Sequence, residues 1–104
     1  MPSIAPSRPA PVSDTLPRER LAPLYRILVH NDDVTPMDLV VRVLKRFFRL
    51  SRHEADRVML EAHSSGVALV ATLPLEEAEF RVEQAHSFAR GRGVPLTFSI
   101  EPEE

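Results

Sequence analysis

Two groups of polar residues in this chain have the chemistry needed for binding. One is the run Asn31-Asp32-Asp33, and the other is His63, later in the chain. Their amide, carboxylate and neutral imidazole groups all accept hydrogen bonds. Each group also has a purely structural explanation, because Asn and Asp favour turns and a histidine near a helix C-terminus compensates the helix dipole. A functional interpretation therefore requires the two groups to meet in the fold.

Metal chemistry is one alternative for residues of these types. Imidazole and carboxylate groups suit zinc or manganese, so a metal-dependent hydrolase has to be considered. Its ligands would be His30, Asp32, Asp33 and His63. The sequence supplies neither the outer-shell order nor the separate base that such chemistry needs. We therefore expect no enzyme activity, no catalytic residue, no metal and no cofactor.

Composition excludes several further classes of function. The chain has 104 residues, a formal net charge of -2 and no cysteine. This length allows one domain, and the weak negative charge argues against a nucleic-acid partner. The absence of cysteine rules out disulfides and thiolate catalysis. No apolar run approaches the roughly 18 residues of a membrane span, and residues 1–11 lack a signal-peptide pattern. We expect a monomeric cytoplasmic protein without a membrane partner.

The first strand and helix lead into and out of the polar run. Residues 24–30 alternate as a partly buried strand does. One face of this strand holds Tyr25, Ile27 and Val29. A helix is predicted to follow, with Thr35 as its N-cap, Pro36 at the first helical position and Asp38 at the third. Apolar residues at spacings of three and four form one stripe on this helix. They are Met37, Val40, Val41, Leu44, Phe47 and Phe48.

A second helix carries His63 near its end. Ser51 and Glu54 have the capping-box spacing that starts a helix, and Gly66 can end it in the left-handed conformation. Its inner face consists of Ala55, Val58, Met59 and Ala62.

The rest of the chain predicts strand, helix and strand. Residues 67–73 form a short apolar run rich in β-branched side chains, which favours a strand. Pro74 opens a third helix with early acids and late bases, and Gly91 and Gly93 end it. Alternating apolar residues at 96–100 predict the last strand.

The order β-α-α-β-α-β indicates an α+β fold. Its compact form is a three-stranded antiparallel sheet covered on one face by three helices. Six of the ten prolines lie in the first 23 residues, where they prevent regular ladders. We therefore divide the chain into a disordered proline-rich extension (1–23), a folded core (24–101) and a short tail (102–104).

The core resembles the ClpS adaptors, which deliver proteins with destabilising N-terminal residues to the unfoldase of the Clp protease. The main anchors are the loop Asn31-Asp32-Asp33-Val34-Thr35-Pro36-Met37 and the later pair of Met59 and His63. Further matches are Val43-Leu44 with Phe47-Phe48, Gly66, Ala89-Arg90 and Pro95-Leu96. A ribosomal-stalk-like interaction domain could share the fold, but it explains neither the polar run nor His63.

The resemblance implies a site for a free α-amino group. In the family, positions matching Asn31, Asp33 and His63 hold this group, and Asp32 lies beside them. An α-amino group has a pKa of about 7.7–8.0, so near neutral pH it is mostly an ammonium with three donors and no acceptor. Three acceptors of different kinds suit it. The implied ligands are N-degron proteins that begin with Leu, Phe, Tyr or Trp.

A pocket for the first side chain is also implied. It maps onto His30, Thr35, Met37, Val40, Met59, Ala62 and Leu96. Two positions depart from the family pattern, since His30 replaces an aliphatic residue and Ala62 replaces valine. We expect Ala62 to enlarge the pocket and the imidazole of His30 to meet a tyrosine hydroxyl or an indole N–H.

The third helix is expected to contact the unfoldase. The family's docking contacts carry over to Glu76 and Arg81, where arginine replaces lysine. The implied partner is the N-terminal domain of a Clp AAA+ unfoldase, of the ClpA or the ClpC type. The proline-rich extension matches in position the family's unstructured segment that is threaded toward the unfoldase during handover.

Overall fold

The computed structural model describes residues 22–103, so the predicted extension lies almost entirely outside the described residues. The elements follow the expected order β-α-α-β-α-β. They are β2 (Leu24–His30), α2 (Met37–Phe48), α3 (Arg52–Ser65), β3 (Val67–Pro74), α4 (Leu75–Gly91) and β4 (Thr97–Pro102).

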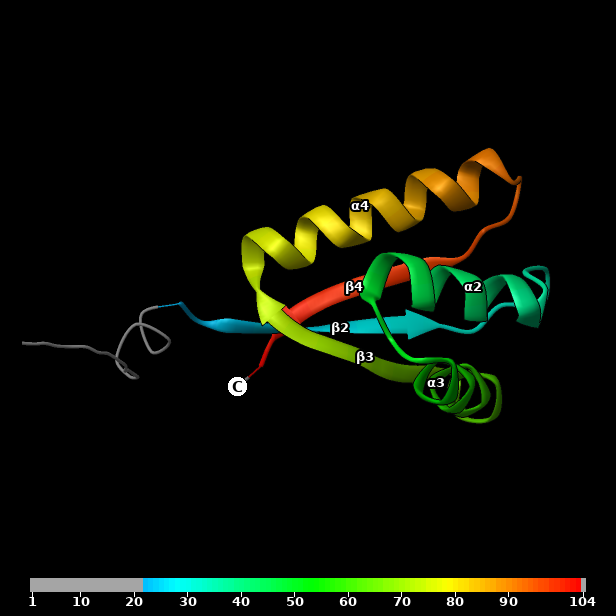
Figure 1. Ribbon diagram of the computed structural model, residues 1–104, viewed down its shortest axis with the longest axis horizontal. Helices are drawn as coiled ribbons and strands as arrows, with labels where there is room; N and C mark the ends of the chain where they lie inside the picture. The colour runs from blue at the N-terminus through cyan, green and yellow to red at the C-terminus, as the bar shows by residue number, and fades with distance from the viewer. Residues whose placement is uncertain (1–21, 104) are drawn as a thin grey trace, which may run out of the picture.

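β2 is the central strand of the sheet. It pairs antiparallel with β3 on one side and with β4 on the other (Figure 1). At its end, His30 lies opposite Val67 of β3 and Thr97 of β4. A register shift between Ile27 and Leu28 marks an irregularity in the β2–β3 pairing. The predicted three-stranded antiparallel sheet and α+β class are confirmed.

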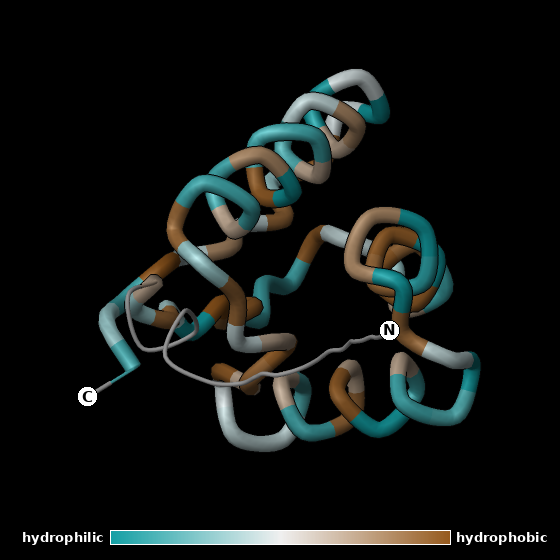
Figure 2. The backbone as a smooth tube through the Cα atoms, turned by 60° about the vertical axis from the view of Figure 1, so that its left-hand side comes forward, coloured by the Kyte–Doolittle hydropathy of each residue, from teal (hydrophilic) through white to brown (hydrophobic). Residues whose placement is uncertain are grey.

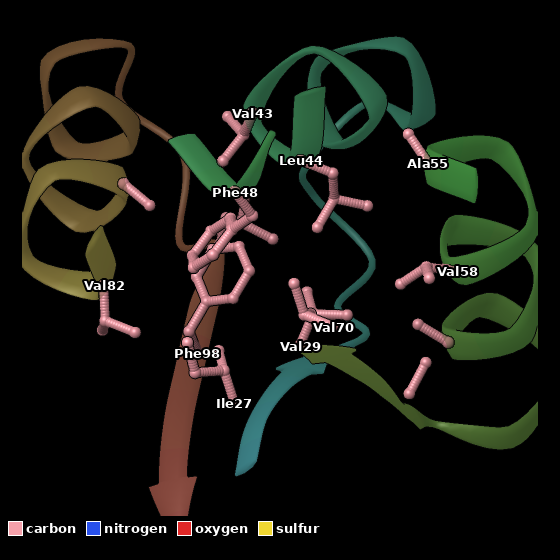
Figure 3. Packing of buried hydrophobic residues seen from close by; sticks show 14 of the residues in the cluster. Ile27, Val29, Val43, Leu44, Phe48, Ala55, Val58, Val70, Val82 and Phe98 are labelled. Carbon is pink, nitrogen blue, oxygen red and sulfur yellow. The ribbon is translucent and has the colours of Figure 1, made fainter. Parts of the chain in front are cut away.

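The helices pack on one face of this sheet. Buried side chains from α2, α3 and α4 point toward buried residues of the three strands (Figure 3). Hydrophobic and hydrophilic residues alternate along each helix, as in amphipathic helices (Figure 2). On β2, Ile27 and Val29 are buried, whereas Leu28 and His30 are only partly buried. The sheet therefore has one covered face and one more open face.

Contacts between α2 and the sheet form part of the core. Phe48 and Phe98 pack with their ring centroids 4.9 Å apart. Val41, Leu44 and Phe48 are buried as the predicted stripe requires. Leu39 and Val43 are buried as well, although the stripe did not include them, so the buried face of α2 is wider than predicted.

Neither end of α2 has one of the usual capping residues. Pro36, not Thr35, occupies the N-cap position, and no side chain caps the helix. The Thr35 hydroxyl donates instead to Asp32 Oδ2 at 2.9 Å, so the predicted Thr35 cap was wrong because a nearby carboxylate takes the hydroxyl. At the other end, Arg49 adopts a left-handed conformation with φ 60°, a position usually given to glycine.

The capping of α3 follows the sequence closely. Ser51 Oγ accepts a hydrogen bond from the backbone N–H of Glu54 at 3.0 Å, and Glu54 Oε1 accepts one from the backbone N–H of Ser51 at 2.9 Å. The predicted capping box is confirmed. Gly66 ends the helix with φ 94°, as predicted, and its N–H donates to the carbonyl oxygen of Ala62.

Candidate functional site

A pocket of about 330 Å³ lies where β2 runs into the loop before α2. Every residue predicted for the α-amino site or the side-chain pocket lines it. These residues are His30, Asn31, Asp32, Asp33, Thr35, Met37, Val40, Met59, Ala62, His63 and Leu96. The two polar groups that were separate in the sequence therefore lie around one cavity.

The end of α3 is tied to the start of the loop. The left-handed conformation of Gly66 turns the chain from α3 into β3, which pairs with β2. The carbonyl oxygen of Gly66 accepts a hydrogen bond from the backbone N–H of Asn31 at 3.0 Å. This bond holds the first residue of the polar run close to the helix end that carries His63.

Asp32 braces the loop from within. Its Oδ1 accepts hydrogen bonds from the backbone N–H groups of Val34 at 2.8 Å and Thr35 at 2.7 Å, and its Oδ2 accepts from the Thr35 hydroxyl at 2.9 Å. Burial alone would raise the pKa of Asp32, but the hydrogen bonds from Thr35 and Val34 outweigh it and lower the pKa. The carboxylate therefore stays charged and fixes the loop geometry.

The other polar residues of the site face solvent. Asn31, Asp33 and His63 are all exposed, and each lines the pocket. An amide, a carboxylate and an imidazole therefore surround the rim with acceptors available to an incoming cation. Because these acceptors are exposed, the protein can present them to a charged group without the unfavourable desolvation that deeply buried acceptors would require.

The inner wall of the pocket is apolar. Ala62 and Leu96 are buried, Val40 and Met59 are partly buried, and Met37 is 44% exposed at the mouth. A cavity of this kind, apolar inside with a few polar groups at its edge, is typical of small-ligand sites.

Three residues that sequence reasoning missed also line the pocket. They are Val29, Val34 and Pro36. Each is a chain neighbour of a predicted site residue, so adjacency to the polar run was the signal that could have found them.

The ligand set of the metal alternative does not form. Within residues 22–103, no group of three or more histidine, aspartate or glutamate side chains is placed to hold a metal ion. The carboxylate of Asp32 is already used by its own loop.

A membrane-spanning helix is also missing from residues 22–103, since each helix there is too short or too polar to span a bilayer.

Comparison with known proteins decides between the remaining interpretations. Residues 20–99 match the family model of the ATP-dependent Clp protease adaptor protein ClpS. The chain belongs to the ClpS family.

Relatives and a solved structure agree with this assignment. The chain is 46% identical to the ClpS adapter protein of Roseobacter denitrificans, over 86% of this chain and 80% of the relative. It is 40% identical to the ClpS 2 adapter protein of Mesorhizobium japonicum, over 90% of this chain and 99% of the relative. The structure of Agrobacterium tumefaciens ClpS2 bound to L-phenylalaninamide is similar, with a TM-score of 0.76 and 39% sequence identity. The match covers 79% of this chain and 99% of the Agrobacterium chain. The predicted resemblance is confirmed.

His30 is the main departure of this ClpS chain from what the sequence suggested. Side chains alternate along a strand, so His30 shares a face with Leu28 rather than with the buried Val29. Its Nε2 is hydrogen-bonded to Ser99 Oγ at 2.7 Å, and Ser99 is the β4 partner of Leu28. The imidazole is therefore engaged on the open face of the sheet. His30 still lines the pocket, and the expectation that its imidazole meets a ligand hydroxyl or indole N–H stays a prediction, one that would require its bond to Ser99 to break.

The two predicted docking residues on α4 have different surroundings. Glu76 is exposed in the first turn of the helix. Arg81 is bound within the molecule: it donates to Glu77 Oε2 at 2.8 and 3.0 Å and to the carbonyl oxygen of Phe47 at 3.0 Å. The Arg81 side chain is only 19% exposed. It links α4 to the end of α2.

Proposed function

We propose that this ClpS-family chain grips the free N-terminal residue of another polypeptide and delivers that polypeptide to a Clp unfoldase. The observation that carries the proposal is the convergence of Asn31, Asp33 and His63 at the rim of one apolar pocket. The pocket volume of about 330 Å³ falls at the small end of the usual range of ligand sites, about 300–1,000 Å³. It suits one residue rather than a long peptide.

The chemistry of an N-terminus fits this arrangement. The ammonium carries three donors and no acceptor, and the rim presents an amide oxygen, a carboxylate and a ring nitrogen. Hydrogen bonds to charged groups contribute roughly 1.5–3 kcal/mol each, and burial of a Leu or Phe side chain about 1.5–3 kcal/mol. Association costs at least about 4 kcal/mol, so at most about 8 kcal/mol remains, which corresponds to an affinity no tighter than about micromolar. A carrier that must release its cargo needs such an affinity.

The ligand of the solved relative supports the same assignment. L-Phenylalaninamide, bound to the Agrobacterium protein, has a free α-amino group, a bulky apolar side chain and an amide in place of the carboxylate. It therefore has the features of the first residue of a polypeptide. For this chain the proposed ligands are proteins that begin with Leu, Phe, Tyr or Trp.

Delivery is proposed to occur through α4 and the N-terminal extension. The exposed carboxylate of Glu76 is available for docking to the N-terminal domain of a ClpA- or ClpC-type unfoldase. We propose that Arg81 contributes there as well, chiefly by presenting the end of α4 through its bonds to Glu77 and Phe47. The proline-rich extension is proposed to act at handover. All of this would take place in the cytoplasm, with the chain acting as a monomeric adaptor and not as an enzyme.

A titration with peptides that differ only at their first residue tests the proposal. Peptides beginning with Leu, Phe, Tyr or Trp should bind, and peptides beginning with Gly, Ser or Glu should bind at least tenfold more weakly, a difference of about 1.4 kcal/mol. Equal affinity across the series would contradict it, because an apolar pocket must distinguish these side chains. The Asn31→Ala variant should bind each of these peptides more weakly than the parent protein does.

A further inference from the structure

An open groove of about 700 Å³ runs between α2 and α3 and begins beside the pocket. Met37 and Met59 line both cavities, so they form the boundary between them. At its far end this helix groove reaches Lys45 and Arg52, on either side of the turn that joins the two helices. The pocket and the helix groove are therefore adjacent and share these two side chains.

The length of the helix groove corresponds to a few residues of extended chain. From Met37 to Lys45 is eight helical steps (45 − 37), or roughly 12 Å at about 1.5 Å per residue. An extended polypeptide rises about 3.3 Å per residue, so about three or four residues span this distance. The floor is apolar, because Val41 is 8% exposed and Met59 is partly buried.

The charges along the helix groove are mostly positive. Four basic residues and two acidic ones line it, a local balance of +2 (4 − 2), although the whole chain carries -2. They are Arg42, Lys45, Arg46, Arg52, Asp38 and Asp56.

Two of these basic side chains are already engaged and two are available. Arg52 forms an ion pair with Asp56 at 3.4 Å. Arg46 lies over the rings of Phe47 and Phe88, with its guanidinium carbon 5.3 and 5.6 Å from their centroids. Arg42 and Lys45 are exposed and have no acidic partner within the part of the chain that the structure describes.

We propose that the helix groove binds residues two to five of the same polypeptide whose first residue fills the pocket, and that it favours acidic side chains at positions three to five. This inference rests on the proposed function. The polar rim is proposed to take the α-amino end, and Met37 and Met59 border both the pocket and the helix groove. Asp38 lies at the near end, so attraction by Arg42 and Lys45 acts beyond the second residue.

The test uses three peptides that all begin with Phe-Ser and continue with three glutamates, three glutamines or three lysines. Fluorescence anisotropy with the full-length chain should give an affinity order of glutamate, glutamine, lysine. Exposed ion pairs are weak individually, so the first and last should differ by about threefold to tenfold at low salt. The difference should narrow at about 0.5 M salt, because screening removes it.

Charge variants locate the effect. Arg42→Glu combined with Lys45→Glu should reverse the affinity order, and Arg42→Gln combined with Lys45→Gln should abolish it. Arg57→Glu is the matched control, since Arg57 is exposed on α3 and lines a different cavity. It should leave the order unchanged, and thermal melts should show that all variants remain folded.

The outcomes separate this inference from the function on which it rests. If the three peptides bind equally and acetylation of Phe still abolishes binding, the groove assignment is overturned and first-residue binding stands. If no peptide binds, both are overturned. If the double Glu variant loses affinity for the unfoldase N-terminal domain but not for peptides, the helix groove is a docking surface and the inference is wrong.

Discussion

The carbonyl oxygen of Gly66 accepts a hydrogen bond from the backbone N–H of Asn31 at 3.0 Å. This single bond joins the residue that ends α3 to the residue that begins the polar loop. It is possible because Gly66 adopts φ 94°, which turns the chain directly into β3 beside β2. The position of His63 relative to Asn31 therefore depends on the backbone conformation of a glycine.

Gly66→Ala is expected to destabilise the protein and to weaken N-terminal peptide binding. A methyl group at Gly66 meets no atom within 4 Å, so the cost comes from the left-handed backbone and amounts to about 1–2 kcal/mol. Gly91→Ala is the matched control, because Gly91 lies in α4 without a positive φ and also has open space. The Gly91→Ala substitution should raise the free energy of unfolding by about 0.5–1 kcal/mol. Urea unfolding measures both, and equal effects would contradict the role given to Gly66.

Asp32 and Asp33 are neighbours with different expected roles. Asp32→Asn removes an ionised acceptor of three hydrogen bonds and should lower the free energy of unfolding by about 1 kcal/mol. Asp33→Asn should leave stability unchanged, because Asp33 is exposed, and should weaken peptide binding by roughly tenfold. Parallel denaturation and anisotropy measurements on the two variants test the division. If Asp33→Asn binds as the parent does, Asp33 is not a contact.

His86 is expected to make the free energy of unfolding depend on pH. Burial, and to a lesser extent the charge of Arg90, lowers the pKa of His86. In its neutral form, His86 Nε2 accepts a hydrogen bond from the backbone N–H of Phe98 at 2.9 Å. Below the unfolded pKa of about 6.5 the unfolded state binds more protons than the native state, so stability falls as pH falls. The contribution is fully present above that pH. The test compares the urea unfolding midpoint at pH 7.5 with that at pH 5. The difference between the two midpoints should be smaller in His86→Gln than in the parent protein. The control variant His53→Gln, at an exposed position, should show the same difference as the parent.

Met37 is expected to guard the pocket mouth. Met37 is 44% exposed and lines the pocket, and we expect the side chain of a bound first residue to leave its backbone at this point. Ile and Val are branched at Cβ and are thick at that point. Met37→Ala should therefore admit peptides that begin with Ile or Val, measured by anisotropy against a Leu-initiated peptide. A uniform loss of affinity for all first residues would indicate that Met37 only supports packing.

Local sequence signals predicted most of the fold because they act over a few residues. The Ser51 and Glu54 capping box, the left-handed Gly66 and the alternation along residues 24–30 each depend on near neighbours, and the structure confirms them. Thr35 was misassigned because the carboxylate of Asp32 competes for its hydroxyl. Arg49 carries no sequence signal for its φ of 60°.

The candidate site residues were predicted from the motif, but their individual orientations depend on tertiary structure. The polar run and His63 line one pocket, as the resemblance implied. The bond from His30 to Ser99 joins residues far apart in the sequence, and so does the bond from Arg81 to the Phe47 carbonyl. Neither contact follows from spacing along the chain. The helix groove likewise exists only because α2 and α3 pack against each other.

The most direct test of the central claim is the affinity of one Phe-initiated peptide with a free and with an acetylated N-terminus. Acetylation removes the positive charge and two of the three donors that the rim of Asn31, Asp33 and His63 is proposed to bind, and it leaves the phenyl side chain unchanged. The account predicts binding of the free peptide near micromolar and loss of at least a hundredfold, about 2.7 kcal/mol, on acetylation. Equal affinity for the two peptides would contradict it.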